Sequence, residues 1–158
     1  MTLTGSDDAG SIIAGHAGKH IKPSVLELGG NDAQIVFEDA DLDNAVSCSM
    51  FRFMVTRQVC ISPKRMFIHE DIYDEFVERF KERISATKIG DPMDPATGIE
   101  PLSSQDAQET IREQISRAVE YGATATELGE PIPDHGWFVQ PTLLTGIELD
   151  NPIWREEL

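Results

Sequence analysis

One cysteine and one glutamate stand where they could carry out covalent catalysis. Cys60 lies just before an apolar, β-prone run, and Glu27 lies where an apolar strand gives way to Gly29 and Gly30. A thiol nucleophile needs a carboxylate that activates water and backbone amides that hold an oxyanion. Each residue has an ordinary alternative, because a lone cysteine is often an inert core residue and a glutamate at a strand end is often a solvated charge. Their combination makes a cysteine nucleophile assisted by Glu27 the hypothesis to test.

The N-terminal segment contains a second candidate for ligand binding. Thr4, Gly5 and Ser6 precede two acidic residues, a pattern that predicts a helix with a hydroxyl cap and acids in its first turn. Free amides at such a helix start can hold a phosphate, although an ordinary cap gives the same pattern. His16 and His20 are spaced like metal ligands on a helix. Since no third ligand accompanies them, we expect no metal site.

Composition argues against several classes of protein. The 158 residues include 28 acidic and 13 basic side chains, for a formal net charge of −15, which repels the phosphates of nucleic acids. We therefore expect no nucleic-acid partner. The longest apolar runs are too short to span a bilayer and no signal peptide is visible, so we expect no membrane association. Two cysteines make no disulfide framework, which favours a reducing cytoplasm.

The hydrophobic patterns predict a layered α/β domain with a largely parallel sheet, because strand and helix patterns alternate. The most regular helix follows Asp71, which should cap it. Another helix should begin at a capping box formed by Ser103 and Asp106. A third should run from the acids near Asp41 to about Val55. Extended segments are expected at residues 24–28, 34–37, 65–69, 123–128 and 138–147.

Several motifs, taken in order, resemble those of the NAD(P)-dependent aldehyde dehydrogenase superfamily. Residues 3–6 are similar to the family's Phe-Thr-Gly-Ser, and residues 25–30 contain its Glu-Leu-Gly-Gly signature. Residues 58–60, followed by Lys64 and Arg65, match its cysteine signature, and residues 138–142 and 156–158 match later blocks. The ordered set covers nearly the whole chain. Its wording is closest to the succinate-semialdehyde dehydrogenase branch.

The resemblance implies a three-layer α/β, aldehyde dehydrogenase-like catalytic domain that is truncated at both ends. Residues 1–29 would be the C-terminal remnant of a cofactor-binding domain, and residues 30–158 the N-terminal part of the catalytic domain. Cys60 would attack a small-molecule aldehyde such as succinate semialdehyde, its backbone amide would help to hold the oxyanion, and Glu27 would activate water. NAD or NADP would be held by five residues, Gly5, Ser6, Leu28, Gly29 and Glu157.

The chain also departs from the family in ways that bear on activity. Arg57 stands where the family has a glycine, and Met54 stands where the semialdehyde branch has an arginine for the substrate carboxylate. A full member is roughly three times as long. We therefore expect the isolated chain to be inactive. Two functions stay open: a dehydrogenase subunit completed by homo-oligomerisation or by a complementing N-terminal fragment, and a catalytically dead remnant that serves only as a folded or protein-interaction domain.

Overall fold

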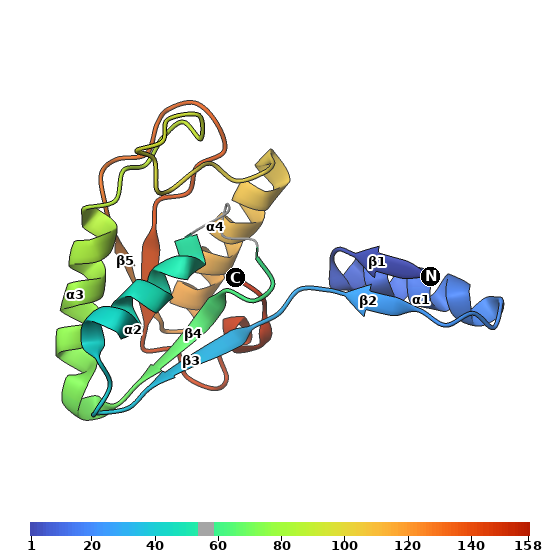
Figure 1. The fold of residues 1–158 in the computed structure, drawn as a ribbon, viewed down its shortest axis with the longest axis horizontal. Coiled ribbons are helices and arrows are strands. Elements are labelled where there is room, and N and C mark those ends of the chain that lie inside the picture. The colour runs from blue at the N-terminus through green and yellow to red at the C-terminus, as the bar shows by residue number, and fades with distance from the viewer. Residues whose placement is uncertain (54–58) are drawn as a thin grey trace. The chain divides into compact units, whose positions relative to one another are not determined.

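The computed structural model describes residues 1–53 and 59–158. Contacts between residues divide the chain into two compact units, Met1–Gly30 and Asn31–Leu158 (Figure 1). The helix end near Val55 and the interpretations of Met54 and Arg57 fall on residues 54–58 and so lie outside the described residues. The assignment of the two units to a cofactor-binding and a catalytic domain stays a prediction.

The first unit consists of one helix and two short parallel strands. β1 (Thr2–Thr4) pairs with β2 (Val25–Glu27), and α1 (Asp7–Lys19) forms the connection between them. The helix begins as the sequence predicts. Ser6 is its N-cap, and the Ser6 hydroxyl oxygen accepts a hydrogen bond from the Ala9 N–H at 3.3 Å.

The second unit is layered. In chain order its elements are β3 (Asp32–Val36), α2 (Leu42–Ser49), the 3-10 turn η1 (Met50–Phe53), β4 (Pro63–Ile68), η3 (Glu70–Ile72), α3 (Tyr73–Ser85), α4 (Gln105–Glu120), β5 (Thr124–Glu127), β6 (Thr142–Thr145) and η4 (Pro152–Arg155). Helices α2 and α3 lie on one side of the strands, and α4 lies on the other (Figure 1). This arrangement agrees with the layered α/β class expected from the alternating patterns.

Strand pairing differs from the single, largely parallel sheet that was expected. Strands β3 and β4 are parallel, with Val36 opposite Ile68, whereas β5 and β6 are antiparallel. Within the described residues the strands form three separate two-stranded pairs. One edge of β4 and one edge of β6 therefore have no strand partner among these residues.

Two apolar clusters hold the second unit together. The larger cluster joins β3, α2 and α3 and contains Phe76, Phe80 and Ile84, as the helical periodicity predicted. The rings of Phe76 and Phe80 stack with their centroids 6.0 Å apart. The smaller cluster joins α4 to η4 through Ala118 and Ile153. None of the helices in the described part of the chain is long and apolar enough to cross a membrane.

Two predicted helix caps were wrong. Asp71 does not cap α3, because it lies inside η3, where its N–H donates to Nδ1 of His69. The N-cap of α3 is Ile72, which makes no side-chain cap bond. For α4 the cap is Ser104 rather than Ser103, and the Ser104 hydroxyl oxygen accepts the backbone N–H three residues later at 3.1 Å. The capping-box prediction was therefore displaced by one residue.

Candidate active site

Cys60 lies in a short turn that leads into β4. The residue is exposed and its thiol is free. Ser62, which is fully buried, closes the turn. Its backbone N–H and its hydroxyl both donate to the carbonyl oxygen of Val59, at 3.1 and 2.7 Å. An accessible thiol is therefore carried on a backbone that local hydrogen bonds hold in place.

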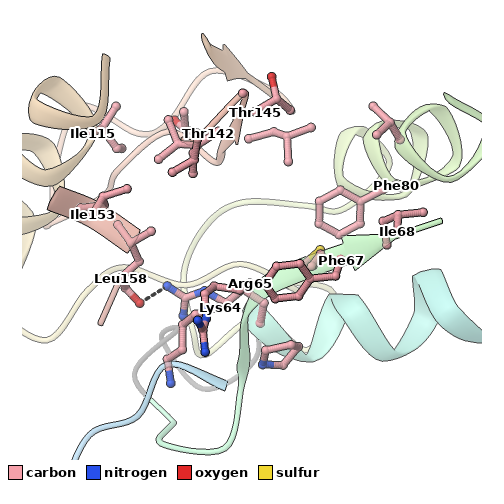
Figure 2. A pocket seen from close by; sticks show the side chains of 18 of the residues that line it. Lys64, Arg65, Phe67, Ile68, Phe80, Ile115, Thr142, Thr145, Ile153 and Leu158 are labelled. Atoms are coloured by element: carbon pink, nitrogen blue, oxygen red, sulfur yellow. Dashed lines mark hydrogen bonds between the residues drawn. The ribbon is translucent and has the colours of Figure 1, made fainter. Parts of the chain in front are cut away.

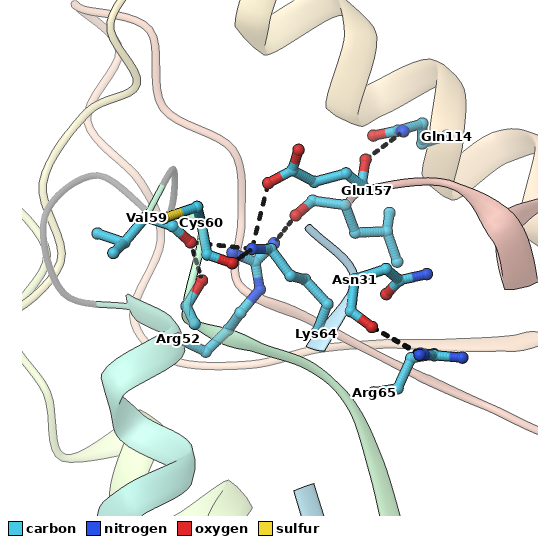
Figure 3. Close-up of polar contacts among 10 residues, drawn as sticks. Asn31, Arg52, Val59, Cys60, Lys64, Arg65, Gln114 and Glu157 are labelled. Carbon is cyan, nitrogen blue, oxygen red and sulfur yellow. Dashed lines mark hydrogen bonds and ion pairs between the residues drawn. The ribbon is translucent and has the colours of Figure 1, made fainter. Parts of the chain in front are cut away.

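A buried lysine also fastens this turn. The Lys64 side chain is inaccessible to solvent, and its ammonium donates to the carbonyl oxygens of Val59 at 2.9 Å and Cys60 at 3.0 Å. The ammonium lies 3.1 Å from Oε1 of Glu157 (Figure 3). Burying a charge is costly unless its hydrogen-bonding capacity is used, and an ammonium has three donors. These three acceptors match that number, which explains how a lysine can be buried here.

Two side chains bind the backbone of the C-terminal residues Glu157 and Leu158. Gln114 of α4 donates from Nε2 to the Glu157 carbonyl oxygen at 2.8 Å, and the Arg52 guanidinium donates to the carbonyl oxygen of Leu158. Burial lowers the pKa of Arg52 below its ordinary value, and the negative charge of Glu157 partly offsets that effect. The carboxylate of Glu157, whose side chain is 41% exposed, thus interacts with two cationic side chains.

Arg65, the next residue of β4, contacts Asn31 and, in the C-terminal segment, the ring of Trp154. Its Nε and Nη2 donate to the carbonyl oxygen of Asn31 at 3.0 and 2.6 Å. The guanidinium lies 5.9 Å from the ring centroid of Phe67 and 5.8 Å from that of Trp154. Asn31 in turn donates from Nδ2 to the Trp154 carbonyl oxygen at 3.3 Å. Lys64 and Arg65, which are adjacent in β4, therefore both contact the C-terminal segment, residues 151–158.

A pocket of about 410 Å³ lies beside these contacts (Figure 2). Strands β4 and β6 line it together with apolar side chains of α3 and α4, among them Phe80 and Ile115. Three cationic side chains, Arg52, Lys64 and Arg65, also line it. The pocket therefore combines apolar walls with positive charge, next to strand edges that lack a partner in the described structure.

The remaining predicted site residues lie in the first unit. The Gly5 N–H donates to the Glu27 carbonyl oxygen at 3.0 Å, so the helix start and the strand end are adjacent, and the Glu27 residue is exposed. Leu28 packs against Gly10 of α1. A Cβ atom added to Gly10 would come within 2.7 Å of the Leu28 side chain. Gly29 is exposed. Within residues 1–53 and 59–158, no group of three or more His, Cys, Asp or Glu side chains could hold a metal ion.

Comparison with known proteins decides the family. A model of the aldehyde dehydrogenase family matches residues 1–158. The chain belongs to the aldehyde dehydrogenase family. The succinate-semialdehyde dehydrogenase (NADP+) of Mycobacterium avium (strain 104) is 46% identical over an alignment 158 positions long, which covers 99% of this chain and 34% of that protein. The chain thus spans about a third of the length of this relative.

Solved structures of other aldehyde dehydrogenases have the same fold. The succinic semialdehyde dehydrogenase of Streptococcus pyogenes, in complex with NADP+, aligns with a TM-score of 0.92 and 43% identity, over 99% of this chain and 34% of that one. The lactaldehyde dehydrogenase of Escherichia coli aligns with a TM-score of 0.89 and 35% identity, over 96% of this chain and 32% of that one. The aldehyde dehydrogenase-like α/β fold is therefore confirmed, and because these two relatives are named for different aldehydes, the fold alone does not select a substrate.

In this aldehyde dehydrogenase chain, the structure connects two of the predicted site residues. Cys60 and Glu157 are far apart in sequence, and both are bonded to Lys64. Gly5 and Glu27 are adjacent within the first unit. The roles of these residues in catalysis or cofactor binding stay predictions.

Sequence reasoning missed the residues that make the connection. Lys64 was noted only as part of a motif, and Ser62, Arg52 and Gln114 were not singled out. The available signal was a lysine directly before an arginine and an apolar run at a strand start. A charged side chain in such a strand needs a distant partner, but the sequence does not identify that partner.

Proposed function

We propose that Cys60 is the nucleophile of an aldehyde-oxidising site and that Glu157 holds the ribose of the NADP+ cofactor. The observation that carries this proposal is the exposed thiol on a turn that Lys64 ties to Glu157. Family membership supports aldehyde oxidation, and the names of the relatives support NADP+ and succinate semialdehyde. We also propose that residues 1–29 belong to the cofactor-binding domain and residues 30–158 to the catalytic domain, and the compact units Met1–Gly30 and Asn31–Leu158, whose boundary is one residue later, support this division.

The chemistry assigned to the chain begins at the thiol. Attack by the Cys60 sulfur on the aldehyde carbon gives a thiohemiacetal, whose oxygen the Cys60 N–H would help to stabilise. NADP+, when bound, supplies the acceptor for the aldehyde hydride. Glu27 would then activate the water that releases the acid from the Cys60 thioester, which is the task of a general base.

The residues present fit the cofactor only in part. Glu157 offers a partly exposed carboxylate, and a carboxylate is a suitable acceptor for ribose hydroxyls. At the start of α1, however, Asp7 and Asp8 occupy the first turn beside Gly5 and Ser6. Negative side chains there oppose a pyrophosphate, which would otherwise be favoured by the helix N-terminus. We therefore propose that the isolated chain binds NADP+ weakly and is inactive.

Further proposals concern partners and location. The apolar pocket between β4 and β6, together with exposed Ile35 and Phe37 on or beside β3, favours a homo-oligomer or pairing with a complementing N-terminal fragment. The alternative is a catalytically dead domain that only folds or binds proteins. Because Cys48 and Cys60 are both free, we propose a reducing, cytoplasmic location.

Formation of NADPH by the purified chain tests the proposal. The chain is mixed with NADP+ and succinate semialdehyde or an uncharged aldehyde, beside the variants Cys60→Ala and Cys48→Ala. Turnover that is lost in Cys60→Ala and kept in Cys48→Ala supports the cysteine mechanism and contradicts the expected inactivity of the isolated chain. No turnover by a chain with a native circular dichroism spectrum agrees with that inactivity. Turnover that survives Cys60→Ala contradicts the proposed nucleophile.

A further inference from the structure

The peptide group between Val59 and Cys60 has an unusual set of hydrogen-bond partners. Its carbonyl oxygen accepts three donors: the Ser62 N–H at 3.1 Å, the Ser62 hydroxyl at 2.7 Å and the Lys64 ammonium at 2.9 Å. The other end of the same peptide group is the N–H of Cys60. One of these bonds is enough to close the turn, and the other two place additional donors on the same oxygen.

A donor on a carbonyl oxygen affects the N–H of the same amide. Hydrogen bonds in a chain polarise one another, so an amide whose oxygen is bonded becomes a stronger donor through its N–H. The effect is greater when the first donor is charged and when water is excluded, and Lys64 meets both conditions because its side chain is inaccessible to solvent. The same contacts also fix the orientation of the peptide plane.

We propose that Lys64 is a positioning residue that orients and polarises the Val59–Cys60 peptide, so that the Cys60 N–H stabilises the oxygen of an aldehyde added to the Cys60 sulfur. This inference rests on the proposed function, in which Cys60 adds to an aldehyde. Ser62 assists through its hydroxyl. Neither side chain touches the reacting atoms in this account, since both act through the Val59 carbonyl.

The third contact of the ammonium explains why Lys64 keeps its place. The Lys64 ammonium forms an ion pair with Oε1 of Glu157 in the C-terminal segment. Gln114 of α4 donates a hydrogen bond to the backbone carbonyl oxygen of Glu157 and so fixes that residue. The lysine is thereby fixed by two carbonyl oxygens of the turn and by a carboxylate from a distant part of the chain (Figure 3). Loss of Lys64 would therefore remove the charged donor and leave the peptide plane held by the two bonds from Ser62 alone.

Aldehyde addition can be measured without a cofactor, because it involves no oxidation. The sulfur–carbon bond forms while the carbonyl π bond breaks, and the thiol proton passes to the former carbonyl oxygen, directly or through solvent. The addition is reversible, and the added aldehyde blocks alkylation of the sulfur. The apparent dissociation constant of the aldehyde at Cys60 therefore follows from its protection against iodoacetamide, and Cys48 serves as the internal reference in the same chain.

The experiment compares the whole chain with Lys64→Met, Lys64→Arg and Lys81→Met, using succinate semialdehyde and acetaldehyde as probes. Lys81 is a matched control because it forms an ion pair with Glu78 on α3, three residues away. We expect Lys64→Met to weaken aldehyde binding at Cys60 about tenfold, less than the loss of a direct oxyanion donor. Lys64→Arg should restore part of the loss, and Lys81→Met should have no effect. Alkylation rates without aldehyde show whether the thiol itself has become more accessible.

Each outcome decides the inference. If wild-type Cys60 is protected and Lys64→Met is protected equally well, Lys64 has no such role, while the proposed nucleophile stands. If aldehyde protects wild-type Cys60 no better than Cys48, the proposed function fails and the role of Lys64 fails with it. If Lys64→Met does not fold, Ser62→Ala is tested in its place. About threefold weaker aldehyde binding at Cys60 in Ser62→Ala supports the inference, and an unchanged dissociation constant of the aldehyde overturns it.

Discussion

Arg65→Lys tests whether β4 is held to the C-terminal segment as the structure describes. The substitution keeps the positive charge and removes the planar group that bonds twice to the Asn31 carbonyl oxygen, at 3.0 and 2.6 Å. It also removes the flat cation that lies 5.9 and 5.8 Å from the ring centroids of Phe67 and Trp154. We expect a clear loss of stability without a change in net charge.

The magnitude follows from the contacts that lysine cannot reproduce. A hydrogen bond from a charged donor contributes about 1.5–3 kcal/mol, and a lysine can keep one of the two bonds at most. Each ring contact contributes roughly 0.5–1 kcal/mol at a partly exposed site, and an ammonium retains part of it. The free energy of unfolding should therefore fall by about 2 kcal/mol. With a urea slope of about 1–3 kcal/mol per molar, the midpoint should shift down by roughly 1 M.

Trp154 provides the assay, because its ring contacts both Arg65 and Phe67. Urea unfolding is followed by tryptophan fluorescence in a Trp137→Phe background, so that Trp154 is the reporter. Arg83→Lys on the exposed surface of α3 is the matched control and should change stability by less than about 0.5 kcal/mol. Equal midpoints for Arg65→Lys and Arg83→Lys would refute the reasoning.

Three further predictions follow from single contacts. Asn151→Ala should cost about 2–3 kcal/mol in urea unfolding, because this 1%-exposed side chain donates to the Ala118 carbonyl oxygen at 2.9 Å, and a loss below about 1 kcal/mol would contradict it. Ser104→Ala should cost about 1 kcal/mol of thermal stability, which Ser104→Asp should preserve, and equal losses in both would argue against the cap. The Lys88 hydrogen bond lowers the pKa of Asp94, so its contribution is present above the unfolded-state pKa and is lost as pH falls through the folded-state pKa. The stability difference from Asp94→Asn should close on acidification, and a difference independent of pH would contradict this.

Features that depend on neighbouring residues could be predicted from the sequence. The Ser6 cap of α1 and the buried face of α3 with Phe76 and Phe80 follow from side-chain type and helical spacing. The Asp71 cap was wrong because a 3-10 turn precedes α3, so the helix starts one residue later than that cap requires. Such a turn has no distinctive spacing over three residues, and tertiary packing decides it.

Features that depend on distant residues could not be predicted. Local patterns placed strands near β5 and β6 but did not indicate that the two pair antiparallel. The candidate site shows the same limit. Cys60 and Glu157 were identified from motifs, whereas their connection through buried Lys64 depends on a contact between the start of β4 and the end of the chain. Burial and pairing of a lysine are properties of the folded core, which one sequence does not specify.

The central claim is that Cys60 adds to aldehydes, and carbon-13 NMR of an aldehyde labelled at its carbonyl carbon tests it directly. The labelled aldehyde is mixed with the chain, with Cys60→Ser and with Cys48→Ser. The account predicts a tetrahedral carbon signal, bound to the protein, that is present with the wild-type chain and Cys48→Ser and missing with Cys60→Ser. A signal of equal strength in all three samples, or no signal from the folded wild-type chain, would contradict it.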